Sequence, residues 1–119
     1  MERYPLEALL SVRHYREEGA KRRVRGAENA LREAEAEMEK KKKELEAFRI
    51  WRVEEEDRRY AAIMGVPMRM EKLDAFKNGL ALLVAQENDK EQAVVLAGKE
   101  VERRKEELLH AQEAVKTAR

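Results

Sequence analysis

The sequence "IMGVPM" at residues 63–68 is the one strong helix breaker in this chain and decides its fold. A glycine can take the left-handed backbone conformation that ends a helix, and a proline shortly after it prevents the helix from continuing. The residues on both sides are rich in Ala, Glu, Lys, Arg and Leu, which are strong helix formers. We therefore predict a helix over about residues 5–62, a turn over about 63–67 and a second helix over about 68–118.

The two predicted helices carry matching seven-residue repeats. In the second helix the a positions are Leu73, Leu80, Glu87, Val94, Val101, Leu108 and Val115, and the d positions are Phe76, Leu83, Lys90, Ala97, Arg104, Ala111 and Ala118. In the first helix they are Val24, Leu31, Met38 and Leu45 at a, with Ala20, Ala27, Ala34 and Phe48 at d. Such a repeat makes the narrow seam of a coiled coil. The predicted fold class is all-α, with two long helices forming an antiparallel coiled-coil hairpin in a single domain, residues 1–119.

The two stripes can be aligned in more than one register. We prefer the register that places Phe48 opposite Leu80, because it also pairs the polar seam residues Lys41 and Glu87. A slip by one heptad would place Lys41 on Val94, which is less favourable. The preferred register also brings both chain ends to the same end of the hairpin.

The composition argues against several classes of protein. Charged residues make up 43% of the chain, far above the globular average of roughly 25%, so a compact core is not expected. The 26 basic and 25 acidic residues balance, and this balance implies no bulk attraction to nucleic acid or to a membrane. The apolar runs are too short to span a bilayer, which takes about 20 residues. We expect no direct membrane insertion, and the absence of cysteine excludes a disulfide framework.

The sequence contains no recognisable catalytic or cofactor-binding pattern. The five glycines are scattered and form no phosphate-binding loop. His14 and His110 have no arranged third metal ligand, and Ser11 is the only serine in the chain. A two-helix hairpin also offers no pocket that excludes water. We therefore predict that the protein is not an enzyme and binds no cofactor or metal.

Two stretches carry apolar side chains that a two-helix seam cannot bury. Those near the turn include Trp51, Tyr60, Ile63, Met64, Val66 and Met68. Those at the start of the chain are Tyr4, Leu6, Leu9 and Leu10, with Arg13, Arg16, Arg22 and Arg23 following them. Aromatic, Met and Arg side chains are enriched at protein interfaces. The simpler interpretations are that Trp51 and Tyr60 pack against Phe76, and that the first turns pack locally on the C-terminal helix.

The start of the chain resembles the opening of the stalk proteins of bacterial type III secretion systems. This YscO/SctO group includes chlamydial members and is related to flagellar FliJ. The residues that carry the resemblance are Tyr4, Pro5, Leu6, Glu7, Leu9, Leu10, Arg13 and Arg16. Over the rest of the chain the resemblance is in general features only: a charged helical hairpin with one break.

The resemblance implies a non-enzymatic central stalk with two ends. The end with both termini would face a hexameric secretion ATPase, through the eight residues from Tyr4 to Arg23 named above. The tip, with Trp51 and the other residues near the turn, would face the cytoplasmic ring of the export gate. Some members also bind chaperones of secreted translocators, so such chaperones are implied partners. The implied location is cytoplasmic, peripheral to the inner-membrane secretion apparatus, and the free protein is expected to be a monomer.

Two other classes of function stay open at the level of sequence. A generic coiled-coil scaffold or adaptor would form a stable dimer and would leave a hexameric ATPase unaffected. The segment "KRRVR" at residues 21–25 could contact phosphates, but it lies among glutamates and lacks interleaved aromatics, so we expect no nucleic-acid partner. Members of the family also run longer at the C-terminus than this chain, and a truncated chain is one interpretation of that difference.

Overall fold

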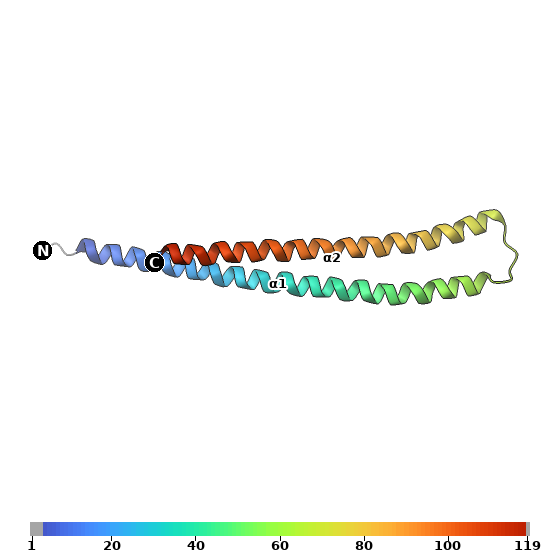
Figure 1. Ribbon diagram of the computed structural model, residues 1–119, viewed down its shortest axis with the longest axis horizontal. Coiled ribbons are helices and arrows are strands. Elements are labelled where there is room, and N and C mark those ends of the chain that lie inside the picture. Colours follow the sequence, from blue (N-terminus) through green and yellow to red (C-terminus); the bar gives the residue numbers. More distant parts are fainter. Residues whose placement is uncertain (1–3, 119) are drawn as a thin grey trace. The chain divides into compact units, whose positions relative to one another are not determined.

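The computed structural model describes residues 4–118, without the side chain of Tyr4. It contains two helices, α1 over Tyr4–Ile63 and α2 over Met70–Ala118, of 60 and 49 residues (Figure 1). The prediction of an all-α chain with two long helices is confirmed. The helix α1 ends within one residue of the predicted position, whereas α2 begins two residues later than predicted.

The turn between the helices is built as the breaker sequence suggests. Gly65 has a φ of 73°, the left-handed conformation that favours glycine. The amide of Val66 donates to the carbonyl of Ile63 at 3.1 Å, which closes the end of α1. The carbonyl of Arg69 accepts from the amide of Leu73 at 3.0 Å, so the first hydrogen bond of α2 starts from Arg69. This bond explains why α2 begins after Pro67 and Met68 rather than at them.

The chain forms two compact units. The first contains residues 1–37 and 98–119, and therefore both chain ends, as the sequence suggests. The second contains residues 38–97 with the turn. In each unit a segment of α1 runs antiparallel to a segment of α2 (Figure 1). That the whole chain behaves as a single domain stays a prediction.

In the first unit, small and branched residues of the predicted seam form the contact between the helices. Ala20 is fully buried, and Ala34 and Val101 are 8% and 6% exposed. Val24 and Val115 line one shared groove, which places the early part of α1 beside the end of α2. The first turns of α1 extend beyond the C-terminal end of α2 (Figure 1). Within residues 4–118, these turns consequently have no segment of α2 alongside them.

In the second unit the apolar seam is short and is followed by charged residues. Leu45 and Leu83 are buried, and Phe48 and Leu80 are half-buried. Beyond Phe48, the positions of α1 that continue the heptad repeat hold Arg52, Glu55 and Arg59, which are half-buried too. The residues predicted to form the seam are therefore buried or half-buried, as expected. The seam also extends further toward the turn than the apolar pattern indicates.

The preferred register is wrong, and the second unit shows why. Glu87 of α2 lies beside Arg49 and Arg52 of α1, at 3.6 and 3.1 Å, and not opposite Lys41. Lys41 instead pairs with Glu44 of its own helix at 3.6 Å. The helices are thus paired about one heptad later along α1 than predicted. Two arginines that the apolar pattern leaves out satisfy the Glu87 carboxylate better than one lysine could.

Candidate partner-binding surfaces

The first candidate surface lies at the start of α1 in the first unit. We call it the terminal surface; its described members are Leu6, Leu9, Leu10, Arg13, Arg16, Arg22 and Arg23. The three leucines are 65%, 67% and 54% exposed. An open groove runs from Leu6 to Arg16 and reaches Thr117 and Ala118 of α2. The side chain of Tyr4, also predicted here, lies outside the described residues.

The arginines of the terminal surface differ in their pairing from those of α2 in the same unit. Within the described part of the chain, Arg13, Arg16 and Arg23 make no ion pair, and Arg22 lies 6.0 Å from the ring of Tyr15. Arg103 and Arg104 of α2 are held by carboxylates, as in the bond from Arg103 to Glu100 at 2.7 Å. The terminal surface therefore combines exposed leucines with guanidinium groups that are free to bind an acidic partner.

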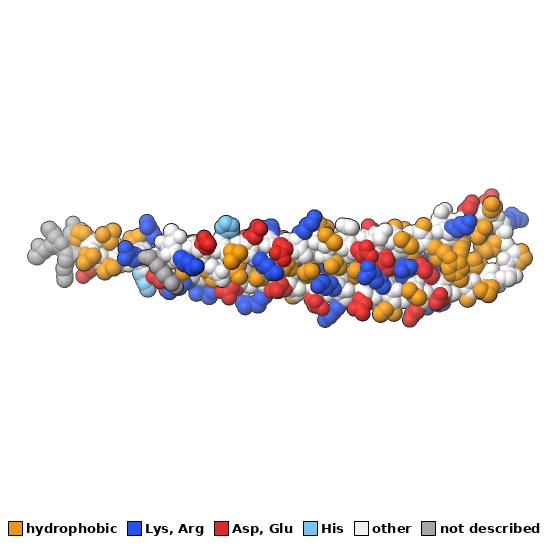
Figure 2. Space-filling view, viewed as in Figure 1, with side chains coloured by type: hydrophobic (Ala, Val, Ile, Leu, Met, Phe, Trp, Pro, Cys, Tyr) orange, Lys and Arg blue, Asp and Glu red, His pale blue; other side chains and the backbone are white. Residues whose placement is uncertain are grey.

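The second candidate surface lies around the turn of the second unit. We call it the tip surface; it comprises Trp51, Tyr60 and Ile63 of α1 and Met64, Val66 and Met68 of the turn. Met64 is the most exposed of these at 78%, while Ile63 and Met68 are half-buried. Figure 2 shows hydrophobic side chains gathered beside the turn. All six predicted residues lie in the second unit.

The aromatic side chains near the turn make local contacts but stay largely exposed. The ring of Tyr60 meets that of Phe76 edge to face at 5.2 Å, so the two helices touch here, as the simpler interpretation holds. The ring of Trp51 meets Phe48 at 5.5 Å instead of Phe76. Both remain open to solvent, Trp51 at 42% and Tyr60 at 51%. Local packing therefore leaves a large part of the Trp51 and Tyr60 side chains exposed to solvent.

A set of partly buried charged residues in the second unit is the feature that the sequence prediction missed. Arg52 donates to Glu56 at 2.8 Å and to Glu87 at 3.1 Å, and these hydrogen bonds, that to Glu56 first, raise the pKa of Arg52. The guanidinium of Arg58, followed by that of Arg59, lowers the pKa of Glu55. Continuing the heptad of the first helix past Phe48 would have placed most of these residues on the seam.

The same region holds a cation–aromatic contact. The ammonium group of Lys90 lies 5.4 Å from the centre of the Phe48 ring. Lys90 occupies a predicted d position and is half-buried, so its aliphatic stem lies in the seam. Its ammonium group is attracted to the face of the Phe48 ring. The polar seam residues Glu87 and Lys90 therefore have different partners, arginines for Glu87 and an aromatic ring for Lys90.

Other kinds of site find no support in the described residues. Over residues 4–118, no group of three or more His, Cys, Asp or Glu side chains is placed to hold a metal ion. No helix in this range is both long and apolar enough to cross a membrane. The grooves that occur in the first unit are open and are lined by exposed side chains.

Comparison with known proteins assigns the chain to a family. Residues 6–119 match the family described as type III secretion protein YscO, so the chain belongs to that family. A crystal structure of the type III secretion protein YscO from Vibrio parahaemolyticus matches with a TM-score of 0.90 and 25% sequence identity. The match covers 97% of this chain and 72% of that one. The comparison with curated proteins found no match.

The family assignment agrees with the resemblance in the first turns of α1. It makes the chain a type III secretion protein, and the solved relative has the same two long helices packed as a hairpin.

Proposed function

We propose that this protein is the non-enzymatic central stalk of a type III secretion system, and that it links the hexameric secretion ATPase to the export gate. The observation that carries the proposal is the presence of two unpartnered surfaces in a YscO-family chain, one in each unit. A connecting protein needs two such surfaces, whereas a simple coiled-coil dimer needs only one continuous apolar stripe.

The terminal surface suits the ATPase. Its unpaired arginines can form charge-assisted hydrogen bonds with carboxylates, and Leu6, Leu9 and Leu10 supply apolar area. Guanidinium groups can also bind the C-terminal ends of helices. A channel wall lined with such groups would hold this end of the chain.

The tip surface suits the export gate. Aromatic and methionine side chains are typical of interface anchors, and methionine adapts its shape to the pocket it enters. We place the protein in the cytoplasm beside the inner membrane, where the two partners meet. Binding of translocator chaperones belongs to the same proposal, and the free protein is a monomer.

Two pairs of substitutions test the proposal with purified ATPase and export-gate cytoplasmic domain. Arg13→Glu with Arg16→Glu should weaken ATPase binding and stimulation and leave gate binding unchanged. Trp51→Ala with Met64→Ala should weaken gate binding and leave the ATPase unaffected. We expect each pair to change its own partner's Kd by about thirtyfold or more, since even one hot-spot residue contributes about 2 kcal/mol.

Matched controls separate these effects from general loss of structure. Lys40→Glu with Lys42→Glu makes the same charge change at exposed lysines of the second unit. Leu82→Ala with Leu96→Ala removes comparably exposed apolar area, 58% and 63%, away from the turn. Equal effects of the terminal and tip pairs on both partners would refute the two-ended model. A stable dimer that binds neither partner would instead favour the scaffold class.

A further inference from the structure

Between residues 50 and 56, α1 keeps Arg52, Glu55 and Glu56 partly buried and leaves the apolar side chains of Ile50 and Val53 exposed. Arg52 and Glu55 each have a side chain 22% exposed, and Glu56 one 25% exposed. Ile50 and Val53, in contrast, are 58% and 52% exposed. A helix that packs only on its neighbour shows the reverse pattern. The stability of the hairpin therefore does not account for the two outward apolar side chains.

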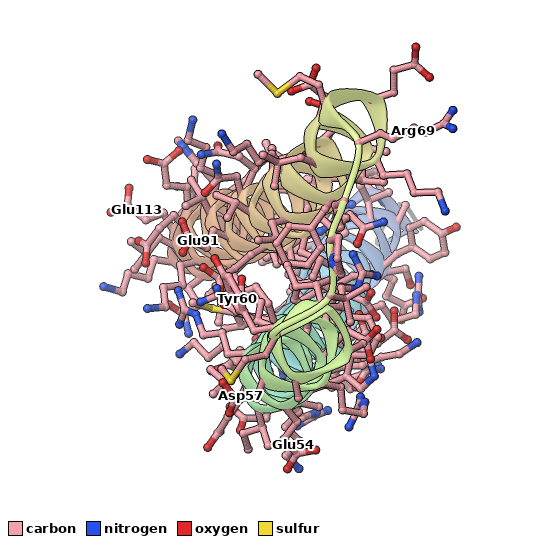
Figure 3. The ribbon with its side chains drawn as sticks, turned by 90° about the vertical axis from the view of Figure 1, so that its right-hand side faces the viewer. Glu54, Asp57, Tyr60, Arg69, Glu91 and Glu113 are labelled. Atoms are coloured by element: carbon pink, nitrogen blue, oxygen red, sulfur yellow. The ribbon has the colours of Figure 1, made fainter. Side chains whose placement is uncertain are left out.

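The same outward side of α1 carries carboxylates. Glu46, Glu54 and Asp57 share a face with Ile50 and Val53, because residues three, four, seven or eight apart lie on one side of a helix. Figure 3 shows Glu54 and Asp57 on the side of α1 away from α2.

These carboxylates are not neutralised by the chain. Within the described residues, Glu46, Glu54 and Asp57 make no ion pair, whereas carboxylates on the inner side of α1 are bonded to arginines. The nearby cation Arg58 is held by Glu55 at 2.6 Å. Lys42 and Lys43 are exposed cations at the N-terminal edge of this face, whereas its C-terminal part around Glu54 and Asp57 holds only Arg58, which is already paired. The outward face is therefore both apolar and negatively charged.

We propose that this apolar-acidic face, made by Glu46, Ile50, Val53, Glu54 and Asp57, binds a basic amphipathic helix of a partner protein. The face spans about three helical turns, or roughly 16 Å, which suits a helix laid along it. Burial of the apolar side chains supplies affinity, and the free carboxylates select lysine or arginine beside the partner's apolar stripe. An acidic helix would meet repulsion instead.

This inference deepens the proposed function, because it names the chemistry of a partner surface near the tip. It rests on the proposed function only for the identity of that partner. Model peptides test the face without the export gate. The peptides can therefore fail to bind while the gate still binds the tip surface, or bind while the gate does not.

The chain contains one tryptophan, and its position makes it a reporter. Trp51 follows Ile50 in sequence and is 42% exposed. The probes are two peptides of about 18 residues with identical leucine positions on one helical face. One peptide carries lysine at all the remaining positions, and the second carries glutamate at those positions. Neither peptide contains tryptophan. The lysine peptide should shift Trp51 emission to shorter wavelength and bind more weakly as salt is raised.

Substitutions on the face should weaken this binding without unfolding the chain. Labelled lysine peptide should bind Glu54→Gln with Asp57→Asn about tenfold more weakly than the unaltered protein. Glu33→Gln with Glu35→Gln makes a matched charge change at exposed residues of the first unit and should leave binding unchanged. Ile50→Ser should weaken binding, whereas Leu109→Ser, at a residue 61% exposed in the first unit, should not. Circular dichroism verifies the helical content of each variant.

Several outcomes would overturn the proposal. The first is equal or tighter binding of the glutamate peptide, which would reduce the face to a generally adhesive surface. The second is no loss of affinity in the Glu54→Gln, Asp57→Asn variant. The third is absence of binding by the lysine peptide at low salt. Concentration-dependent dimerisation in light scattering that this same variant abolishes would make a second copy the occupant and would equally refute a partner helix.

Discussion

Arg52 of α1 donates from Nε to Oε1 of Glu87 in α2 at 3.1 Å, and this bond joins the two helices across their seam. The side chains are 22% and 15% exposed, so water competes with the bond less than at the surface. Arg49 approaches the same carboxylate at 3.6 Å. The position of Glu87 is therefore fixed by two arginines of the opposite helix, and these contacts specify how α1 and α2 are paired.

Removal of Glu87 should destabilise the protein. Glu87→Ala leaves Arg52 without its cross-helix acceptor, and we expect the melting temperature to fall by about 3–6 °C. Arg52→Leu together with Glu87→Leu should recover most of that loss, because an apolar pair suits the seam. Thermal melts followed by circular dichroism measure both.

The control for this prediction is Glu102→Ala. Glu102 pairs with Lys105 at 3.3 Å, but its side chain is 72% exposed, and exposed pairs contribute little. The melting temperature should change by no more than about 1 °C. Equal losses in Glu102→Ala and Glu87→Ala would show that the buried position of Glu87 has no special importance.

Acid should weaken the fold through carboxylates whose pKa is lowered. Arginines lower the pKa of Glu55 and of Glu100 below the ordinary value of 4.5, first through hydrogen bonds from Arg58 and Arg103. A group with a lowered folded-state pKa stabilises the fold above its unfolded pKa and loses this contribution as pH falls through the folded one. The melting temperature should therefore be steady near neutral pH and decline below about pH 4.5.

Glu55→Gln with Glu100→Gln tests this origin. The variant should melt at a lower temperature at neutral pH and should show a shallower decline in acid, because two of the responsible groups no longer titrate. A pH profile parallel to that of the unaltered protein would argue that other groups dominate acid sensitivity.

The turn should be sensitive to a side chain at Gly65. Its φ of 73° is unfavourable for any residue with a Cβ, although no atom lies within 4 Å of the added Cβ. Gly65→Ala should cost about 1 kcal/mol of unfolding free energy. Gly26→Ala, in the interior of α1 with equally open space, should instead gain about 0.5–1 kcal/mol. Urea titrations distinguish the two, and a stabilising Gly65→Ala would contradict the left-handed turn.

Cross-linking can establish the pairing of the helices directly. Cysteines replacing Tyr60 and Phe76, whose rings lie 5.2 Å apart, should be joined readily by a short bifunctional reagent. Cysteines replacing Lys41 and Glu87 should not be. Efficient linkage of the second pair, with none of the first, would restore the register predicted from the apolar pattern.

Much of the fold could be predicted from sequence because its signals are local. The glycine and proline of the turn act on their own backbone, and Gly65 indeed adopts the conformation that ends a helix. The heptad repeat identifies the seam since burial follows from spacing along one helix, as Ala20, Leu83 and Val101 illustrate.

The register could not be predicted in the same way, because it depends on which residues meet across two helices. The apolar pattern ends at Phe48, and it favours a pairing in which Lys41 satisfies Glu87. In the observed pairing Glu87 contacts Arg49 and Arg52. A pattern of apolar residues assigns both arginines to the surface of the helix. Of the candidate surfaces, sequence identified the exposed apolar residues, whereas the inward charges and outward carboxylates of α1 required the structure.

We propose that one chain binds an ATPase and an export gate through separate surfaces. Size-exclusion chromatography with light scattering, on the chain mixed with the cognate ATPase and the gate cytoplasmic domain, tests this proposal. We expect a ternary complex, in which saturating ATPase leaves the chain's affinity for the gate domain unchanged or higher. Displacement of the gate domain by the ATPase, or binding of neither protein at low and moderate salt, would contradict it.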